Sequence, residues 1–509
     1  MPFQTKHNSN SLLRTMSTNF RPFWPVFAVF GLILQFFTFG SGQDIEATLK
    51  IAADGKATVG VRAEFVSKVQ SDDDSRKLWF LDDYAGVRDL TRRLSPVYIY
   101  DKQGYLIAKK SFTAADSPNT RFIGRLEYSV DLKPRSAAAV AHVSWADNNN
   151  GLLMLDDLIP QSMGKTARVR IDLPAGWTIS TSATATEPGV FNIANVEKAI
   201  FAIGKDWRQA EQRSRDHLLN VVISGEWRFV DADLREMGGS IFEGYSKTFG
   251  GSPSSRTQIV IFRMPPEVPF GRWEAETRGS TVVITSSDMP FDTQSRQRLH
   301  EQLRHEMFHL WIPNGVNLSG NYDWFYEGFA LYQSLKMGVA SNRIRFDDFL
   351  DTLGRAMTAD RMHSNGVSLI DASKDRFGGA NSTVYARGLV VAFLCDLAML
   401  DKSKGKRSVE NILREIYKKH HNSPVRTNGN EAVLAAFAAY PELKPIADRY
   451  IKSGDSIAAD QYLSAAGIET HTQNAVTNLT VLPIPDSRQK DLLDKLGYNT
   501  WRKLANISK

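Results

Sequence analysis

The chain of 509 residues contains a single cysteine, Cys395, so an intramolecular disulfide is excluded. Cys395 lies in the apolar run Gly388–Ala398, where a buried structural thiol is expected and no base that could activate a nucleophile is close in sequence. The fold must therefore be stabilised by hydrophobic cores, which a chain of this length can build.

A strong excess of charge is also absent. The formal net charge is +6, and Lys6, Arg14 and Arg21 lie among the first 42 residues, which contain no acid, so the remainder carries +3. No arginine-rich run or stripe of basic and aromatic residues is present, which argues against a nucleic-acid partner. Hydrophobic residues at 42% and charged residues at 23% are typical of globular domains, and the length predicts about two to four of them.

One long apolar segment, Phe23–Phe39, follows Arg21 and precedes the small residues Gly40-Ser-Gly. A basic flank, an apolar core and small residues are the pattern of a secretory signal, and the segment is also just long enough to cross a bilayer as an uncleaved anchor. We therefore expect residues 1–42 to be a signal peptide or N-terminal membrane anchor. The rest of the chain is then exported, periplasmic or secreted, with attachment to the membrane through this segment if it is retained.

Residues 43–229 contain short segments in which apolar and polar residues alternate, separated by turn signals such as Asp54-Gly55. This pattern predicts a β-sandwich, in which His142 and His217 are expected to be ordinary strand residues. The predicted strands are Ala47–Ala52, Ala57–Val66, Val97–Tyr100, Leu126–Val130, Ala139–Trp145, Ala167–Leu173 and Asn220–Ile223.

The pattern changes near residue 230, where helical periodicity begins, and it dominates from Ser295 to about Ala466. Two strand-like segments, Gln258–Phe262 and Thr281–Thr285, interrupt the helices. The expected fold class is therefore α+β. Its expected parts are an N-terminal β-sandwich over 43–229, a catalytic domain over 230–345, an α-helical domain over 346–470, and a C-terminal tail over 471–509 with one short helix at Ser487–Leu496.

The segment His305-Glu306-Met307-Phe308-His309 is an HExxH motif. Residues four apart on a helix share a face, so both imidazoles can reach one zinc ion while Glu306 reaches a water bound to it. The alternative is a helix with two solvated histidines. A second apolar helical segment, Trp324–Tyr332, carries Glu327 and favours the metal site. Two histidines, one glutamate and an open fourth position define a catalytic zinc site, so we expect one Zn²⁺ per chain with Glu306 as base.

HExxH followed by W-x-x-E-G-F-x-x-Y resembles the gluzincin metallopeptidases and, among them, the glycyl aminopeptidase family. The resemblance covers roughly residues 165–470 and is strongest from residue 271. The further segments similar to that family are Leu173–Trp177, Gly271–Ala275, Gly279–Val282, Ser368–Ser373, Tyr385–Gly388, Gly405–Val409, Tyr450–Gly454 and Leu463–Ile468.

The resemblance implies a thermolysin-like catalytic domain that hydrolyses peptide bonds with a zinc-activated water. It implies that Tyr385 donates a hydrogen bond to the oxyanion and that Glu274 binds the free α-amine of a peptide substrate. The expected activity is removal of N-terminal residues from peptides. Two alternatives stay open, a zinc endopeptidase and a catalytically weak relative that only binds peptides.

The sequence departs from the family pattern at several positions. Arg272 and Ala275 stand beside Glu274 where the family has glycine and histidine, which puts the recognition of the N-terminus in doubt. Gln333 and Ser334 stand two turns after Glu327, where related enzymes often carry an acid. The residues after 470 are too few for the PDZ domain of many relatives, so no PDZ-mediated partner is expected. His300, just before the motif, is expected at the surface.

Overall fold

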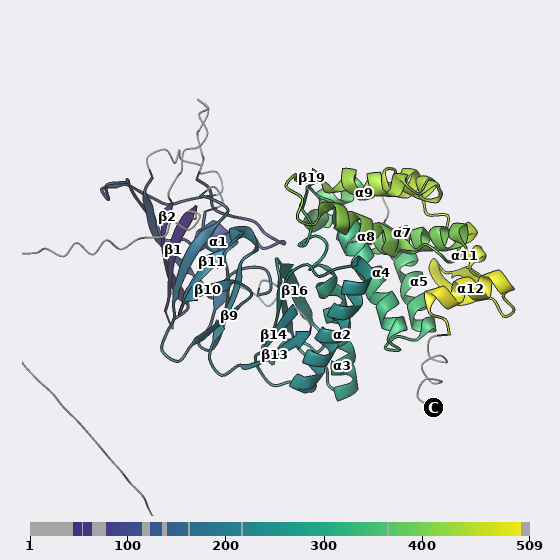
Figure 1. The fold of residues 1–509 in the computed structure, drawn as a ribbon, viewed down its shortest axis with the longest axis horizontal. Helices are drawn as coiled ribbons and strands as arrows, with labels where there is room; N and C mark the ends of the chain where they lie inside the picture. Colours follow the sequence, from purple (N-terminus) through teal and green to yellow (C-terminus); the bar gives the residue numbers. More distant parts are fainter. Residues whose placement is uncertain are drawn as a thin grey trace, which may run out of the picture. The chain divides into compact units, whose positions relative to one another are not determined.

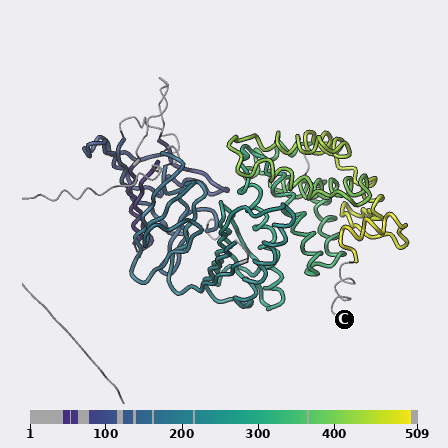
Figure 2. The backbone as a smooth tube through the Cα atoms, viewed as in Figure 1, coloured from purple at the N-terminus to yellow at the C-terminus, as the bar shows by residue number. Residues whose placement is uncertain are grey.

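A computed structural model describes residues 44–499 except 53, 64–77, 114–122, 135–139, 161–162, 215–216 and 364–365. These residues belong to one compact unit, Gln43–Lys509, in which β-sheets come first and helices follow (Figure 1). The apolar segment Phe23–Phe39 lies outside the described residues. The expected N-terminal sheet domain and C-terminal helical region are both confirmed, and the chain path in Figure 2 runs from one to the other.

The N-terminal domain consists of two sheets that share one hydrophobic core. In β1 the side chains alternate between buried and exposed, so that Ile45, Ala47, Leu49 and Ile51 all face this core. The eight-stranded sheet has the order β10 (Thr184–Glu187), β11 (Val190–Ile193), β8 (Ala167–Asp172), β1 (Ile45–Ile51), β2 (Lys56–Ala63), β5 (Arg125–Asp131), β3 (Val97–Tyr100), β4 (Leu106–Lys110). The four-stranded sheet has the order β6 (Trp145–Ala146), β7 (Asn150–Met154), β12 (Ile200–Gly204), β9 (Thr178–Thr181).

A third sheet of five strands carries one wall of the functional site. Its order is β13 (Arg208–Ser214), β14 (His217–Ile223), β15 (Arg256–Arg263), β17 (Thr281–Ser286), β16 (Trp273–Arg278). Strands β14, β15 and β17 are parallel, whereas β16 pairs antiparallel with β17 and forms an edge. One face packs on helices α2 (Asp231–Phe249) and α3 (Asp292–Phe308), and the other packs on the four-stranded sheet. The edge strand β16 is therefore left unpaired along one side, next to α3.

Helices α4 (Asp323–Ala340), α5 (Phe346–His363) and α7 (Asn381–Ser403) form the centre of the helical region, with α6 (Leu369–Lys374), α8 (Val409–His420), α9 (Gly429–Ala438) and α11 (Asp460–Ala465) around them. The stretch Arg376–Ser403 is long and apolar enough to cross a membrane, and an 18-residue part of it has a mean hydropathy of 1.7. Because 83% of that part is buried against neighbouring elements, the stretch is the core helix of this region. Cys395 lies on it and is fully buried, as expected.

The C-terminal residues contain more regular structure than the sequence suggested. Helix α12 (Ser487–Leu496) has the expected bounds, but β20 (Ile468–Gln473) and β21 (Val476–Val481) form a hairpin before it. The hairpin packs on α5 through β21. Its strands are short and mostly exposed, so they lack the apolar alternation from which a strand can be predicted.

Candidate functional site

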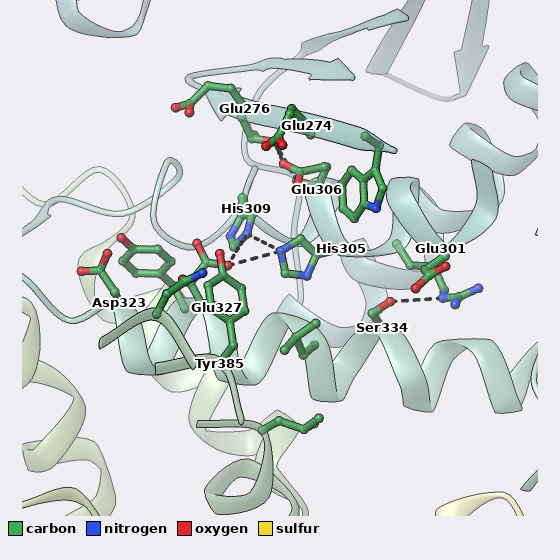
Figure 3. A pocket seen from close by; sticks show the side chains of 18 of the residues that line it. Glu274, Glu276, Glu301, His305, Glu306, His309, Asp323, Glu327, Ser334 and Tyr385 are labelled. Atoms are coloured by element: carbon green, nitrogen blue, oxygen red, sulfur yellow. Dashed lines mark hydrogen bonds and ion pairs between the residues drawn. The ribbon is translucent and has the colours of Figure 1, made fainter. Parts of the chain in front are cut away.

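A large open cavity of about 1750 Å³ lies between the N-terminal domain, β16, and helices α3, α4 and α7. Figure 3 shows how the acidic and imidazole side chains gather in it. Every site residue predicted from the sequence lines this cavity. These residues are Glu274, His305, Glu306, His309, Glu327 and Tyr385.

His305, His309 and Glu327 form the one group of potential metal ligands found among the described residues, with ligand atoms within 4.8 Å of one another. The two Nε2 atoms are 3.3 Å apart, and Glu327 Oε2 lies 3.3 Å from His305 Nε2 and 3.6 Å from His309 Nε2. Ligands about 2.0–2.1 Å from a tetrahedral zinc ion are separated by about 3.3–3.5 Å. The residues therefore fit a zinc ion held by two nitrogens and one carboxylate oxygen.

The hydrogen bonds of His309 and Glu327 leave His309 Nε2 and Glu327 Oε2 available to bind a metal. His309 Nδ1 lies 3.2 Å from the carbonyl oxygen of Ile312 and can donate to it, which leaves the lone pair on Nε2. Glu327 Oε1 accepts from the Arg376 guanidinium at 2.9 Å, whereas the buried Oε2 accepts no hydrogen bond from any described residue. Burial opposes ionisation of Glu327, but Arg376 and His309 hold its pKa well below the usual range.

Glycines bring the helices that carry these residues into direct contact. A Cβ atom added to Gly328 on α4 would lie 2.3 Å from the carbonyl carbon of Gly388 on α7, so only glycine permits this approach. Glu327 is adjacent to the first glycine, and Tyr385 is three residues before the second. The close crossing therefore carries both side chains into the same cavity.

Glu306 is held by β16, whose edge runs beside α3. The Thr277 hydroxyl lies 2.9 Å from Glu306 Oε2 and 3.1 Å from the Glu306 carbonyl oxygen. Because Thr277 donates to one carboxylate oxygen, the other oxygen can accept a proton from a water molecule in the cavity.

Tyr385 and Arg376 are paired next to the metal ligands. Arg376 begins the π-helical segment Arg376–Ala380 that precedes α7, and it donates to the Tyr385 hydroxyl oxygen at 2.6 Å and to Asp323 Oδ1 at 3.1 Å. Burial, followed by the charge of Glu327, raises the pKa of Tyr385 well above 10. Tyr385 is therefore protonated and can donate its own hydrogen to an oxygen in the cavity.

Glu274 and its neighbours form an acidic group at the edge strand. Glu276 is fully engaged: its Oε1 accepts from the Tyr84 hydroxyl at 2.7 Å and from Arg278 at 3.2 Å, and its Oε2 lies 2.9 Å from His142 Nδ1. Glu274 has only a looser contact of 3.7 Å to His142 Nε2, and 30% of its side chain is exposed to the cavity. Of the two carboxylates, Glu274 is the one free to bind a ligand.

The position of His142 differs from the strand predicted for it. It lies in a turn over residues 140–143, outside any strand, and lines the cavity instead of a sheet. Burial alone would lower the pKa of His142, but the neighbouring carboxylates of Glu274 and Glu276 outweigh this and raise it to about 9. A charged imidazole therefore balances part of the negative charge beside Glu274.

Arg376, Thr277 and His142 were all missed as functional residues. Arg376 lies 53 residues after Asp323, and His142 lies 134 residues before Glu276, so no local pattern connects them. Thr277 carried no signal either, because β16 was not predicted as a strand and residues three apart on a strand, such as Glu274 and Thr277, face opposite sides. His300 also differs from expectation, since it is buried and lines the cavity.

The position of Arg376 leads to a prediction about metal affinity. Arg376→Gln removes the charge that fixes Glu327 Oε1, and loss of such a supporting partner weakens metal binding by about 10- to 100-fold. A competition titration with a zinc chelator measures this directly. Arg376→Lys, which keeps the charge, should recover part of the loss. A chelator titration for Arg376→Gln that overlays that of the unaltered protein would show that Glu327 needs no such support.

No family model and no curated protein matches this sequence. Among solved structures, an aminopeptidase N family protein from Idiomarina loihiensis has a TM-score of 0.70 and 16% identity, covering 84% of this chain and 79% of its own. An M1 zinc metallopeptidase from Deinococcus radiodurans, also solved as a mutant with a Tyr-Ser-Ala substrate, gives TM-scores of 0.47 and 0.48. These two matches have 15% identity and cover 79% of this chain and 91% of that one. The first likeness shows that this chain has the fold of an aminopeptidase N family protein.

Proposed function

We propose that this protein is a zinc metallopeptidase that removes N-terminal residues from peptides. The observation that carries the proposal is the His305–His309–Glu327 cluster, whose spacings suit a tetrahedral zinc ion in an open cavity. A zinc ion bound there supplies a Lewis acid that acidifies water and polarises a carbonyl group. An open cavity on the exposed side of the ligands is what a catalytic site needs, whereas a structural site is closed.

The protein's own groups supply the rest of the reaction. Glu306, oriented by Thr277, takes the proton of the attacking water and passes it to the leaving amine. Tyr385 donates its hydroxyl hydrogen to the oxyanion that develops on the substrate carbonyl. Arg376 orients both Tyr385 and Glu327, because one guanidinium contacts both side chains.

Glu274 supports an aminopeptidase over an endopeptidase. It is partly exposed to the cavity and lies on the edge strand beside Glu306, and its one ion pair among the described residues is the 3.7 Å contact with His142. A carboxylate at this point can form a charge-assisted bond to an α-ammonium group, which fixes the first peptide bond over the metal. A mid-chain peptide offers no such charge, so an endopeptidase would gain nothing from Glu274.

The aminopeptidase assignment predicts a preference for a free N-terminus. A peptide with a free α-amine should be cleaved at least about tenfold faster than its N-acetylated twin, because a charge-assisted hydrogen bond contributes about 1.5–3 kcal/mol. Glu274→Gln, which has the same shape without the charge, should abolish the preference as measured by kcat/KM. Glu267→Gln, at an exposed acid before β16, is the matched control.

Cleavage of both peptides at equal rates by the unaltered protein would instead favour the zinc endopeptidase. Binding of both without cleavage would favour a catalytically weak peptide-binding relative. Either outcome leaves the metal site itself in place.

Two finer assignments are proposed on the sequence patterns. The motifs around Glu306, Glu327 and Tyr385 support membership of the glycyl aminopeptidase family, with a thermolysin-like catalytic domain over residues 230–345. The segment Phe23–Phe39 supports export of the chain with residues 1–42 as signal or anchor. A reporter fused after Asp44 that stayed in the cytoplasm would overturn the export proposal.

A further inference from the structure

Arg304 is a buried cation that lines the cavity without an acidic partner. It precedes the ligand His305 on α3 and is only 3% exposed. Its Nε lies 3.3 Å from Ser334 Oγ, and a terminal nitrogen contacts His300 Nδ1 at short range. No described carboxylate forms an ion pair with it. Burial of an unpaired guanidinium is costly, and an anion bound in the cavity would supply the missing partner.

The acids near Arg304 are already engaged by other arginines. Glu301, one turn earlier on α3, pairs with Arg298 at 2.9 Å, and Asp348 on α5 pairs with Arg345 at 3.3 Å. Both acids line the cavity, and each of them already has another arginine as its ion-pair partner.

A second arginine and a neutral histidine complete this part of the cavity. Arg343, in the loop after α4, is exposed, lines the same cavity and has no ion pair to any carboxylate that the structure describes. Burial, with the charges of Arg304 and Arg343, lowers the pKa of His300 to about 3. His300 is therefore neutral, and its Nδ1 accepts a hydrogen bond from Arg304. Two positive charges face the cavity here, and Glu301, the carboxylate whose charge acts on Arg304, is already paired with Arg298.

The position of these groups suits the far end of a short substrate. Ser334 follows Glu327 by seven residues on α4, which is about 10 Å along a helix. In Figure 3, Ser334 and Glu301 lie on one side of His305, whereas Glu276 and Asp323 lie on the other. An extended chain advances about 3.3–3.6 Å per residue. A carboxylate two or three residues from the cleaved bond can thus reach the guanidinium of Arg304.

We propose that Arg304, with Arg343 at the rim, forms an anion subsite that binds a substrate carboxylate beyond the cleaved bond, so that the preferred substrates are short peptides with a free C-terminus. This deepens the proposed function and rests on it for the direction of the peptide. The same carboxylate chemistry is offered by an acidic side chain at that position of a longer peptide, and amidated peptides with or without such a side chain separate the two sources.

The test measures binding, so that it does not depend on turnover. Zinc-loaded Glu306→Gln protein is titrated by calorimetry with Ala-Ala-Ala in four forms, with the N-terminus free or acetylated and the C-terminus a carboxylate or an amide. The carboxylate forms should bind about 10- to 100-fold more tightly than the amides, as expected for a charge-assisted bond in a buried site. Two further amidated peptides, Ala-Ala-Glu and Ala-Ala-Gln, test the side-chain source. Tight binding of the amidated Glu peptide assigns the subsite to an acidic side chain as well.

Substitutions of single arginines show which residues cause the preference for the carboxylate peptides. Arg304→Gln in the same background should abolish the preference for the carboxylate, with zinc content checked because His305 is adjacent. Arg343→Gln, at an exposed position that does not endanger folding, should reduce the preference. Arg355→Gln, at an exposed arginine on α5, is the control that should leave it unchanged.

Equal affinity for the carboxylate and amide forms in the Glu306→Gln protein would overturn the subsite, as would a preference that survives both Arg304→Gln and Arg343→Gln. The aminopeptidase assignment fails on a different arm, namely equal affinity for the free and acetylated N-termini. The two failures are therefore distinguishable in one set of titrations.

Discussion

Replacing Glu306 by Gln is expected to lower kcat by about 10²- to 10⁴-fold while the zinc content stays at that of the unaltered protein. The amide has the shape of the carboxylate but cannot take a proton from water, and general-base catalysis contributes a factor of this size. Glu306 is not in the ligand cluster, so the metal should be retained. The measurement is kcat on a peptide with a free N-terminus, with metal analysis of the same samples.

Glu236→Gln is the matched control for this change, because Glu236 is an exposed acid on α2 outside the cavity. Its turnover should equal that of the unaltered protein. If Glu306→Gln kept near-normal turnover, Glu306 could not be the base, and another group in the cavity would have to be sought.

Tyr385→Phe is expected to lower kcat by about 10²- to 10³-fold with little change in KM. The hydroxyl donates to an oxyanion that exists only in the transition state, and loss of one such donor has an effect of this size. The phenyl ring preserves the packing of α7, and Arg376 still contacts Glu327 through a separate nitrogen. The measurement is a full dependence of rate on substrate concentration, which separates kcat from KM.

Two results would count against this role for Tyr385. One is a rate close to normal in Tyr385→Phe, which would remove the hydroxyl from the mechanism. The other is a rise in KM alone, which would make Tyr385 a group that binds substrate and transition state equally.

The sequence predicted the metal cluster because its parts are local. His305 and His309 are four residues apart on one helix, and Glu327 lies on the next helix, where its aromatic and apolar neighbours already indicated packing against the first. Glu274 was placed at the cavity by the resemblance of Gly271–Ala275 to the glycyl aminopeptidase family, and the structure places it on β16, a strand that the sequence had not indicated.

The surroundings of the cluster could not be predicted in the same way. Arg376 reaches Glu327 from a π-helical segment, and His142 reaches Glu276 from a turn in another domain, and neither contact follows from periodicity. The missing acid at Ser334 was visible in the sequence, but its consequence was not. Only the fold shows that Ser334 faces Arg304 and leaves that guanidinium without a carboxylate.

The central claim is that His305, His309 and Glu327 bind zinc, and metal analysis of the purified protein tests it most directly. About one zinc ion per chain is expected after purification without chelators, and His309→Ala should lose that zinc. Protein that contains no zinc and takes up none when zinc is added would contradict the account, as would a His309→Ala variant with unchanged zinc content.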